Sequence, residues 1–253
     1  MSISIKQLEH LYGNRKVLKN IIHEFEKGQF YGIIGPNGSG KTTLLKLIAN
    51  LLKPSNETIW ISGQDVTTLR EKVRAREMAM VPQIFNIDLA FSVEEIVAMG
   101  RYPYKKGLGD LTENDQAVIY QALDKTNLLN NRLRDVNTLS GGELQRVILA
   151  RAIAQQTSIL LLDEPLSHLD IHHQIDMLNL TKKLSKEEDK TILCVMHDLN
   201  LTMKYCDQVL LLSDGEIYAS GKTKEVLTEE NIRSVYGINA EIVEINGHNI
   251  IIY

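Results

Sequence analysis

The chain has 253 residues, of which 43% are hydrophobic and 24% are charged. These values are ordinary for a globular protein and exclude the compositions of disordered, collagen-like and disulfide-rich chains. The 28 basic and 32 acidic side chains give a net charge of −4, so the sequence offers no overall attraction to nucleic acid.

Two further features of the sequence concern its cellular location. Residues 1–9 contain no basic segment followed by an apolar stretch, so a secretory signal is not expected. The longest apolar runs are far shorter than the roughly 20 residues that span a bilayer. We therefore expect a cytoplasmic protein, in which Cys194 and Cys206 are buried thiols rather than parts of a zinc site or disulfide framework.

Short apolar runs alternate with amphipathic segments along the chain, which is typical of an α/β fold. After the first central run, leucine and isoleucine recur at helical spacing and predict a helix over residues 41–52. Runs that are apolar throughout are expected to be strands buried on both faces. They cover Phe30–Ile34, Ile159–Leu162 and residues 191–196.

A glycine-rich segment connects the first of these strands to the predicted helix. Its pattern is a glycine, four residues and then Gly-Lys-Thr, as in phosphate-binding loops, whose backbone N–H groups surround phosphate oxygens at a helix N-terminus. Lys41 is predicted to reach the β- and γ-phosphates and the Thr42 hydroxyl to bind Mg²⁺. The candidate binding residues are Gly35, Pro36, Asn37, Gly38, Ser39, Gly40, Lys41, Thr42 and Thr43.

Residues 89–156 show helical patterns and no convincing buried strand, which predicts an inserted helical subdomain. Thr112 has the features of a helix start, because its hydroxyl can accept from free N–H groups of the first turn. Two hairpins are predicted later, around Asp214-Gly215 and around Asn246-Gly247.

The strand Ile159–Leu162 ends in two adjacent carboxylates, Asp163 and Glu164. Buried charge at a strand end needs compensation, and a metal ion with a water molecule supplies it. We predict that Asp163 holds Mg²⁺ and that Glu164 orients or deprotonates an attacking water. A solvated Asp-Glu pair at the start of a loop is the alternative.

Residues 139–143, Leu-Ser-Gly-Gly-Glu, resemble the signature of ATP-binding-cassette (ABC) transporter ATPases. Ser140, Gly141 and Gly142 precede a predicted helix over residues 144–155, and so form a second anion-binding helix terminus. The resemblance implies a P-loop NTPase core with a mostly parallel sheet, an antiparallel β subdomain and an inserted helical subdomain. It also implies that this signature closes over ATP held by a second copy, in a head-to-tail dimer.

The same resemblance implies roles for single residues along the chain. Tyr12 matches the aromatic residue that stacks on adenine, and Gln83 matches the glutamine that contacts Mg²⁺ and the water. Asp170 matches the aspartate that couples the two protomers, and His197 matches the histidine at the γ-phosphate. His168 departs from the alanine that is commoner in the family and is given no role.

The resemblance covers nearly the whole chain. It divides the chain into a nucleotide-binding core (residues 1–88 and 157–222), the helical subdomain (89–156) and a tail (223–253). One cassette without a membrane span matches an importer subunit that works with separate permease subunits on the inner face of the cell membrane, and indirectly with a substrate-binding protein. Residues 92–104 and 166–174 are similar to the subfamily that imports iron-siderophore, haem and cobalamin complexes.

Two other functions remain open on the sequence. A soluble regulatory or assembly protein would use ATP-driven dimerisation without a permease. A P-loop kinase would need a site for a phosphoryl acceptor, and it would not require the Ser-Gly-Gly segment at residues 140–142.

Overall fold

The computed structural model describes residues 3–85, 89–105, 110–167 and 169–253. His168 therefore lies outside the described residues. At the centre is a six-stranded sheet with β10 antiparallel to β9 and the other pairs parallel. Its order is β10 (Glu216–Lys222), β9 (Gln208–Ser213), β3 (Phe30–Ile34), β8 (Thr191–Val195), β7 (Ile159–Leu162) and β6 (Met78–Val81). The predicted α/β class is thus confirmed.

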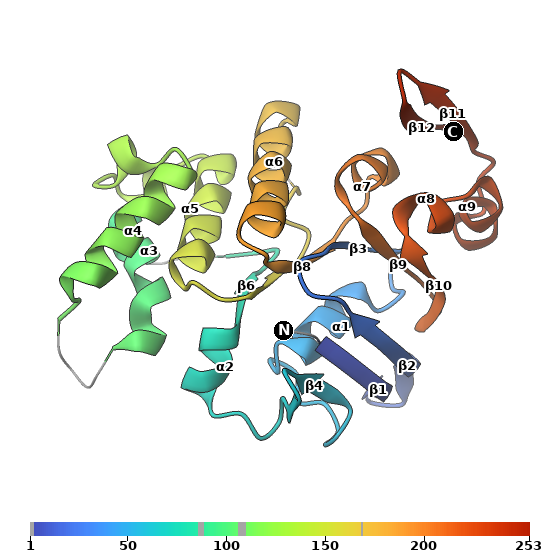
Figure 1. The fold of residues 1–253 in the computed structure, drawn as a ribbon, viewed down its shortest axis with the longest axis horizontal. Helices are drawn as coiled ribbons and strands as arrows, with labels where there is room; N and C mark the ends of the chain where they lie inside the picture. The colour runs from blue at the N-terminus through green and yellow to red at the C-terminus, as the bar shows by residue number, and fades with distance from the viewer. Residues whose placement is uncertain (1–2, 86–88, 106–109, 168) are drawn as a thin grey trace.

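One face of the central sheet is covered by a second sheet and by α1 (Lys41–Ile48) (Figure 1). This helix ends four residues earlier than the sequence predicts, and Asn50 follows it with a positive φ of 53°. The second sheet is antiparallel. Its order is β2 (Arg15–Phe25), β1 (Ile3–Tyr12), β4 (Ile59–Ile61) and β5 (Gln64–Asp65).

The opposite face of the central sheet packs against α5 (Gly141–Ala154), α6 (Ile171–Glu187) and α7 (Leu199–Tyr205). Strand β3 shows why its sequence is apolar throughout. Phe30 and Ile34 point into the core on this side, whereas Tyr31 and Ile33 point into the core beneath the antiparallel sheet. Because both faces of this strand are buried, its sequence does not alternate between apolar and polar residues.

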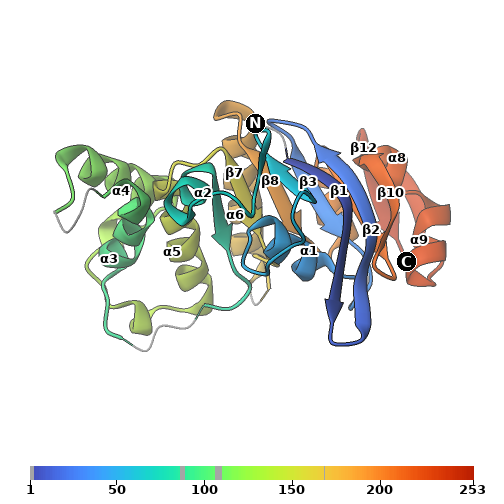
Figure 2. The same ribbon diagram turned by 90° about the horizontal axis from the view of Figure 1, so that it is seen from below.

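A helical lobe extends from one end of the central sheet (Figures 1 and 2). The predicted start at Thr112 is observed as a capping box with Asp115, and Ser92 caps its own helix with Glu95 in the same way. Within the described part of residues 89–156, extended pairing is limited to one isolated bridge. Besides α5, the helices of this side are α2 (Glu71–Glu77), α3 (Val93–Ala98), η1 (Met99–Tyr104), α4 (Glu113–Lys125), η2 (Leu129–Asn131) and η3 (Val136–Thr138).

Arg101 anchors the helical lobe from inside. Its buried guanidinium donates to Asp115 Oδ1 at 2.8 Å, to the carbonyl of Ala154 at 2.8 Å and to Gln156 Oε1 at 2.9 Å. A buried charge is tolerated where its hydrogen-bonding capacity is met by a paired carboxylate and further acceptors. The contacts join η1, α4 and the end of α5.

Both predicted hairpins are observed, and the second lies near the C-terminus. Asn200 on α7 holds this hairpin like a neighbouring strand: its Nδ2 donates to the carbonyl of Ile251 (3.0 Å) and its Oδ1 accepts from the Ile251 N–H (2.8 Å). The C-terminal elements are α8 (Thr223–Val226), α9 (Glu229–Tyr236), β11 (Glu241–Ile245) and β12 (His248–Ile252). Within the described ranges, no helix combines the length and apolar character needed to cross a membrane.

Candidate functional site

The candidate site lies at one edge of the central sheet. Strands β3, β8, β7 and β6 are neighbours and parallel, so their carboxyl ends meet at this edge. The segments that follow them carry the glycine-rich loop, His197, the carboxylates Asp163 and Glu164, and Gln83. Residues up to 162 positions apart in the sequence, Gly35 and His197, are brought together by this topology.

The loop after β3 needs glycine at its two ends. Gly35 has φ 146°, and a Cβ there would lie 2.1 Å from the carbonyl oxygen of Leu212. Gly40 has φ 101°, and a Cβ there would lie 2.5 Å from Leu18 Cδ2. Larger residues would push the loop away from the sheet, so these glycines set the path that leads into the N-terminus of α1.

Lys41 is folded back across this loop. Its Nζ donates to the carbonyls of Gly35 (2.8 Å) and Pro36 (3.0 Å). Burial lowers the pKa of the Lys41 ammonium, while the nearby carboxylates of Glu164 and Asp163 act in the opposite direction. The loop therefore presents a buried positive charge that an anion would stabilise.

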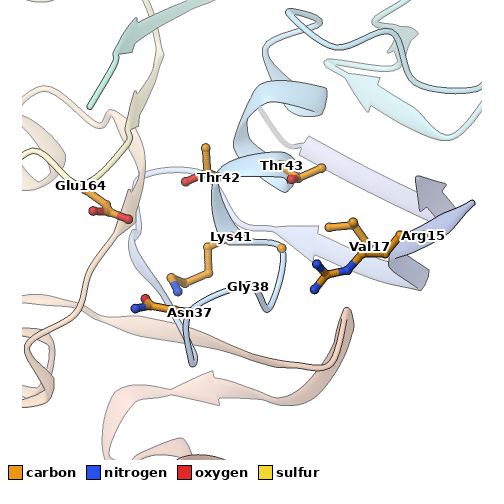
Figure 3. A pocket seen from close by; sticks show the side chains of 9 residues that line it. Arg15, Val17, Asn37, Gly38, Lys41, Thr42, Thr43 and Glu164 are labelled. Atoms are coloured by element: carbon orange, nitrogen blue, oxygen red, sulfur yellow. The ribbon is translucent and has the colours of Figure 1, made fainter. Parts of the chain in front are cut away.

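A pocket of about 230 Å³ opens beside the loop (Figure 3). Ser39, within the loop, is 3% exposed, and its buried hydroxyl oxygen has no hydrogen-bond partner in the described part of the chain. Buried polar atoms are normally paired. This orphaned hydroxyl, together with the buried ammonium, fits a phosphate group. The pocket is lined by Arg15, Val17, Asn37, Gly38, Gly40, Lys41, Thr42, Thr43 and Glu164.

Thr42 and Asp163 meet across the site. The Thr42 hydroxyl donates to Asp163 Oδ1 at 2.8 Å, and Asp163 is 2% exposed. Burial raises the pKa of the Asp163 carboxyl, although the hydrogen bond from Thr42 opposes this. Mg²⁺ prefers hydroxyl, carboxylate and amide oxygens. The buried carboxylate, the hydroxyl and the nearby amide of Gln83 therefore fit this ion.

Glu164 is held on both sides. Gln83 Nε2 donates to Glu164 Oε2 at 2.7 Å, and His197 Nε2 lies 2.8 Å from Glu164 Oε1. Glu164 also has a positive φ of 48°, a backbone conformation that glycine adopts more readily. Besides lining the first pocket, it lines a second cavity of about 250 Å³ together with His197 and Ser167. Its carboxylate is thus fixed where the two cavities adjoin.

The remaining predicted residues lie apart from this pocket. Ser140 caps α5, the helix that begins at Gly141 rather than at residue 144, and forms a capping box with Glu143. Ser140, Gly141, Gly142 and Asp170, all described, are absent from the pocket lining. A Cβ on Gly142 would lie 3.6 Å from the His173 ring, and Asp170 accepts from the His173 N–H at 2.9 Å.

Tyr12 lies at the end of β1, 49% exposed, with its ring in edge contact with His10. It too is absent from the lining, although its cross-strand partner Arg15 is part of it.

Sequence reasoning missed three residues near the loop. Arg15 and Val17 line the pocket from β2. The Tyr236 hydroxyl, on α9, contacts the backbone of Gly35 in a hydrogen bond, and burial raises the pKa of Tyr236 to about 12. Arg15 reaches the pocket through its pairing with Tyr12 across the β1–β2 hairpin, a placement that no local motif of the sequence marks.

Comparison with known proteins identifies related chains. Residues 18–167 match the family described as ABC transporter. The chain is 37% identical over 236 residues to the cobalamin import ATP-binding protein BtuD of Halobacterium salinarum. It is 38% identical over 242 residues to the petrobactin import ATP-binding protein FpuC of Bacillus anthracis. The first alignment covers 93% of this chain but only 59% of the relative; the second covers 96% and 89%.

Solved structures show the same fold. A structure described as a metal-chelate type ABC transporter in an inward-facing conformation matches with a TM-score of 0.86 and 28% identity, covering 100% of this chain and 98% of that one. A dimeric ATP-binding cassette in a post-hydrolysis state, with bound ADP and Pi, matches with a TM-score of 0.76 and 30% identity. That match covers 87% of this chain and 98% of the other.

Proposed function

The chain belongs to the ABC transporter family, and on that basis we propose that it is an ATP-hydrolysing subunit that drives the import of a metal chelate. The observation that carries the proposal is the position of Glu164. Its carboxylate, held by His197 and Gln83, lines the same pocket as Lys41 and Thr42. A phosphate-binding loop and a carboxylate suited to activate water are thus parts of one site.

Binding begins with the loop. Backbone N–H groups at the N-terminus of α1 and the Lys41 ammonium surround the phosphates, and the Ser39 hydroxyl finds its partner there. Thr42, Asp163 and Gln83 would hold Mg²⁺, which would supply positive charge to the phosphate chain. Tyr12 offers a flat aromatic face for the adenine, as it lies on the hairpin next to the pocket.

Hydrolysis requires a water in line with the γ-phosphorus. Glu164 orients this water and accepts its proton as the new P–O bond forms and the bond to the bridging oxygen of ADP breaks. His197 donates to the γ-phosphate and fixes the direction of the Glu164 carboxylate. These contributions are positioning and electrostatic stabilisation, with no covalent intermediate on the protein.

The working unit is a head-to-tail dimer. Ser140, Gly141 and Gly142 lie away from the pocket of their own chain. The Ser140 N–H donates to Glu143, so the N–H groups of Gly141 and Gly142, at the start of α5, are the ones offered to a nucleotide held by a second copy. Asp170 accepts a hydrogen bond from His173, whose ring lies next to Gly142. We place Asp170 on the same dimer interface as this glycine. The dimeric cassette with ADP and Pi supports this arrangement.

The partner in the membrane is a permease. The relatives named for petrobactin and cobalamin import, and the metal-chelate type transporter, support an iron-siderophore complex or a related chelate as cargo. Tyr102, 67% exposed on η1, is a candidate contact for the permease. The subunit then lies in the cytoplasm on the inner face of the membrane. We propose that the chain is divided into a core (1–88, 157–222), a helical subdomain (89–156) and a tail (223–253).

The test measures ATP binding, phosphate release and membrane association on the same protein. The wild-type chain is expected to bind ATP, to release phosphate without an added acceptor and to co-purify with an integral membrane protein. Lys41→Ala is expected to weaken ATP binding by about tenfold or more, since it removes a charge-assisted contact. ADP formation that requires an added acceptor and releases no free phosphate would support a kinase, because the γ-phosphoryl group is then transferred to the acceptor. Lasting separation from membranes would support a soluble regulator.

A further inference from the structure

Arg15 lines the nucleotide pocket although it lies outside the glycine-rich loop. It is the first residue of β2, directly after the two-residue turn at Gly13 and Asn14, and it pairs across the hairpin with Tyr12. Its Nη2 lies 3.8 Å from the position that a Cβ on Gly38 would occupy. Figure 3 shows the guanidinium directed toward the loop, on the side of the pocket away from Glu164.

The charge of Arg15 is not used within the fold. In the described part of the chain, no carboxylate lies within ion-pair distance of its guanidinium. The next residue, Lys16, points to the other face of the strand and pairs with Glu9 at 2.7 Å. Two adjacent cations on one exposed strand therefore differ: one is paired on the outer surface and the other is unpaired beside an anion site.

The positive charge of the loop comes from Lys41, which is little compared with the negative charge of a polyphosphate. Lys41 already donates to the carbonyls of Gly35 and Pro36. A guanidinium presents a planar fork of donors that binds phosphate oxygens in pairs, and it stays charged under all physiological conditions. An unpaired arginine at the rim of this pocket has the chemistry to bind the same phosphate chain from outside.

We propose that Arg15 is a nucleotide-binding residue whose guanidinium contacts the α- and β-phosphates. The inference rests on the proposed function, because it requires a nucleotide in this pocket. Glu164 marks the end where the γ-phosphate is attacked, and Arg15 lies on the opposite side, beside the backbone that surrounds the α- and β-phosphates. The end of the β1–β2 hairpin then recognises both parts of the nucleotide, the base through Tyr12 and the phosphates through Arg15.

The experiment compares dissociation constants for ADP and ATP by calorimetric titration of the purified chain. Arg15→Ala is expected to lower the affinity for ADP and the affinity for ATP by the same factor, about tenfold. This is the effect of losing one exposed charge-assisted contact. Arg15→Lys is expected to restore part of the affinity, because it returns the charge without the fork. The affinity for GDP is expected to fall in Arg15→Ala by the same factor as the affinity for ADP, since the contact does not involve the base.

Lys16→Ala is the matched control. It removes a cation from the neighbouring position of the same strand and is expected to leave both affinities within twofold of wild type. If Arg15→Ala lowers the melting temperature, Arg15→Gln takes its place, because glutamine keeps a long polar side chain without the charge.

An ADP affinity within twofold of wild type in Arg15→Ala overturns the inference, and so does a loss confined to ATP. Lys41→Ala, titrated alongside, distinguishes a failure of the role of Arg15 from a failure of the proposed function. Weak binding by Lys41→Ala with normal binding by Arg15→Ala leaves the proposed function standing and removes Arg15 from the site. A wild-type chain that binds neither nucleotide overturns both.

Discussion

The Nε2 atom of His197 lies 2.8 Å from Oε1 of Glu164. His197 follows β8 and Glu164 follows β7, and these strands are adjacent and parallel. The sheet therefore delivers the imidazole to the carboxylate without help from a flexible loop. The same carboxylate receives a hydrogen bond from Gln83, which follows β6.

Removing the imidazole is expected to impair catalysis more than binding. In His197→Ala the Glu164 carboxylate keeps the bond from Gln83 but loses the contact that fixes its second oxygen. We expect kcat to fall about 10- to 100-fold, the range for a lost hydrogen-bond donor in an active site. KM for ATP should change less than threefold. Steady-state phosphate release measures both constants, and an unchanged kcat would remove His197 from the reaction.

Glu164→Gln is expected to bind ATP normally and to hydrolyse it at least about 100-fold more slowly, because the amide cannot accept the proton of the water. The substitution keeps the shape of the side chain, so Gln83 and His197 still have an oxygen and a nitrogen to contact. Single-turnover phosphate release and equilibrium ATP binding measure the two effects. Glu230→Gln, on the surface of α9, is the control. Undiminished turnover would contradict the role of Glu164.

Acid is expected to loosen the helical lobe through Asp115. The hydrogen bond from the Thr112 hydroxyl, together with Arg101, holds the pKa of the Asp115 carboxyl below its usual value, although burial opposes them. A carboxyl whose pKa is lower in the folded state stabilises the fold above its unfolded pKa of about 3.9 and loses that contribution as the pH falls through the folded value. The loss should therefore begin near pH 4.

Urea unfolding between pH 3 and pH 7 measures this contribution as the free energy of unfolding. Asp115→Asn should be less stable than wild type at pH 7, since it leaves the Arg101 charge buried without its partner. Its stability should also depend less steeply on pH below 4. Equal slopes for the two proteins in that range would show that Asp115 does not titrate as expected.

Asn200→Ala is expected to free the C-terminal hairpin from α7. It removes one donor and one acceptor that bond the backbone of Ile251. At about 1 kcal/mol for each bond, amide exchange in residues 241–252 should accelerate by about tenfold or more. Asn200→Asp keeps the acceptor alone and should fall between. Hydrogen exchange followed by mass spectrometry measures the effect, and Lys204→Ala, exposed on the same helix, serves as the control.

Much of the fold could be predicted because its central strands are buried on both faces. Phe30–Ile34 and Ile159–Leu162 stand out as apolar runs, and each has the predicted bounds. The turn before β4 forms without a glycine, because Glu57 itself adopts a positive φ of 60°. Helix ends were less certain: α1 stops at Ile48 although leucines continue to Leu52, since Asn50 leaves the helical conformation.

The residues of the site divide in the same way. Those in a fixed local pattern, such as Lys41 and Asp163, could be placed from the sequence, because the loop and the strand end carry their own signatures. Arg15 and Tyr236 could not, because they approach the loop only through the pairing of β1 with β2 and the docking of α9. Contacts made by tertiary packing leave no periodic trace in the sequence.

The backbone of Glu164 sets stability against activity. A glycine would occupy its positive φ more readily, and strain of this kind costs about 1 kcal/mol or more. The hydrogen bond from Gln83 and the contact with His197 hold Glu164 in this conformation, so glycine would relieve the strain but lose both contacts and the means of activating water. The strained backbone is thus kept at a position from which the carboxylate lines both cavities.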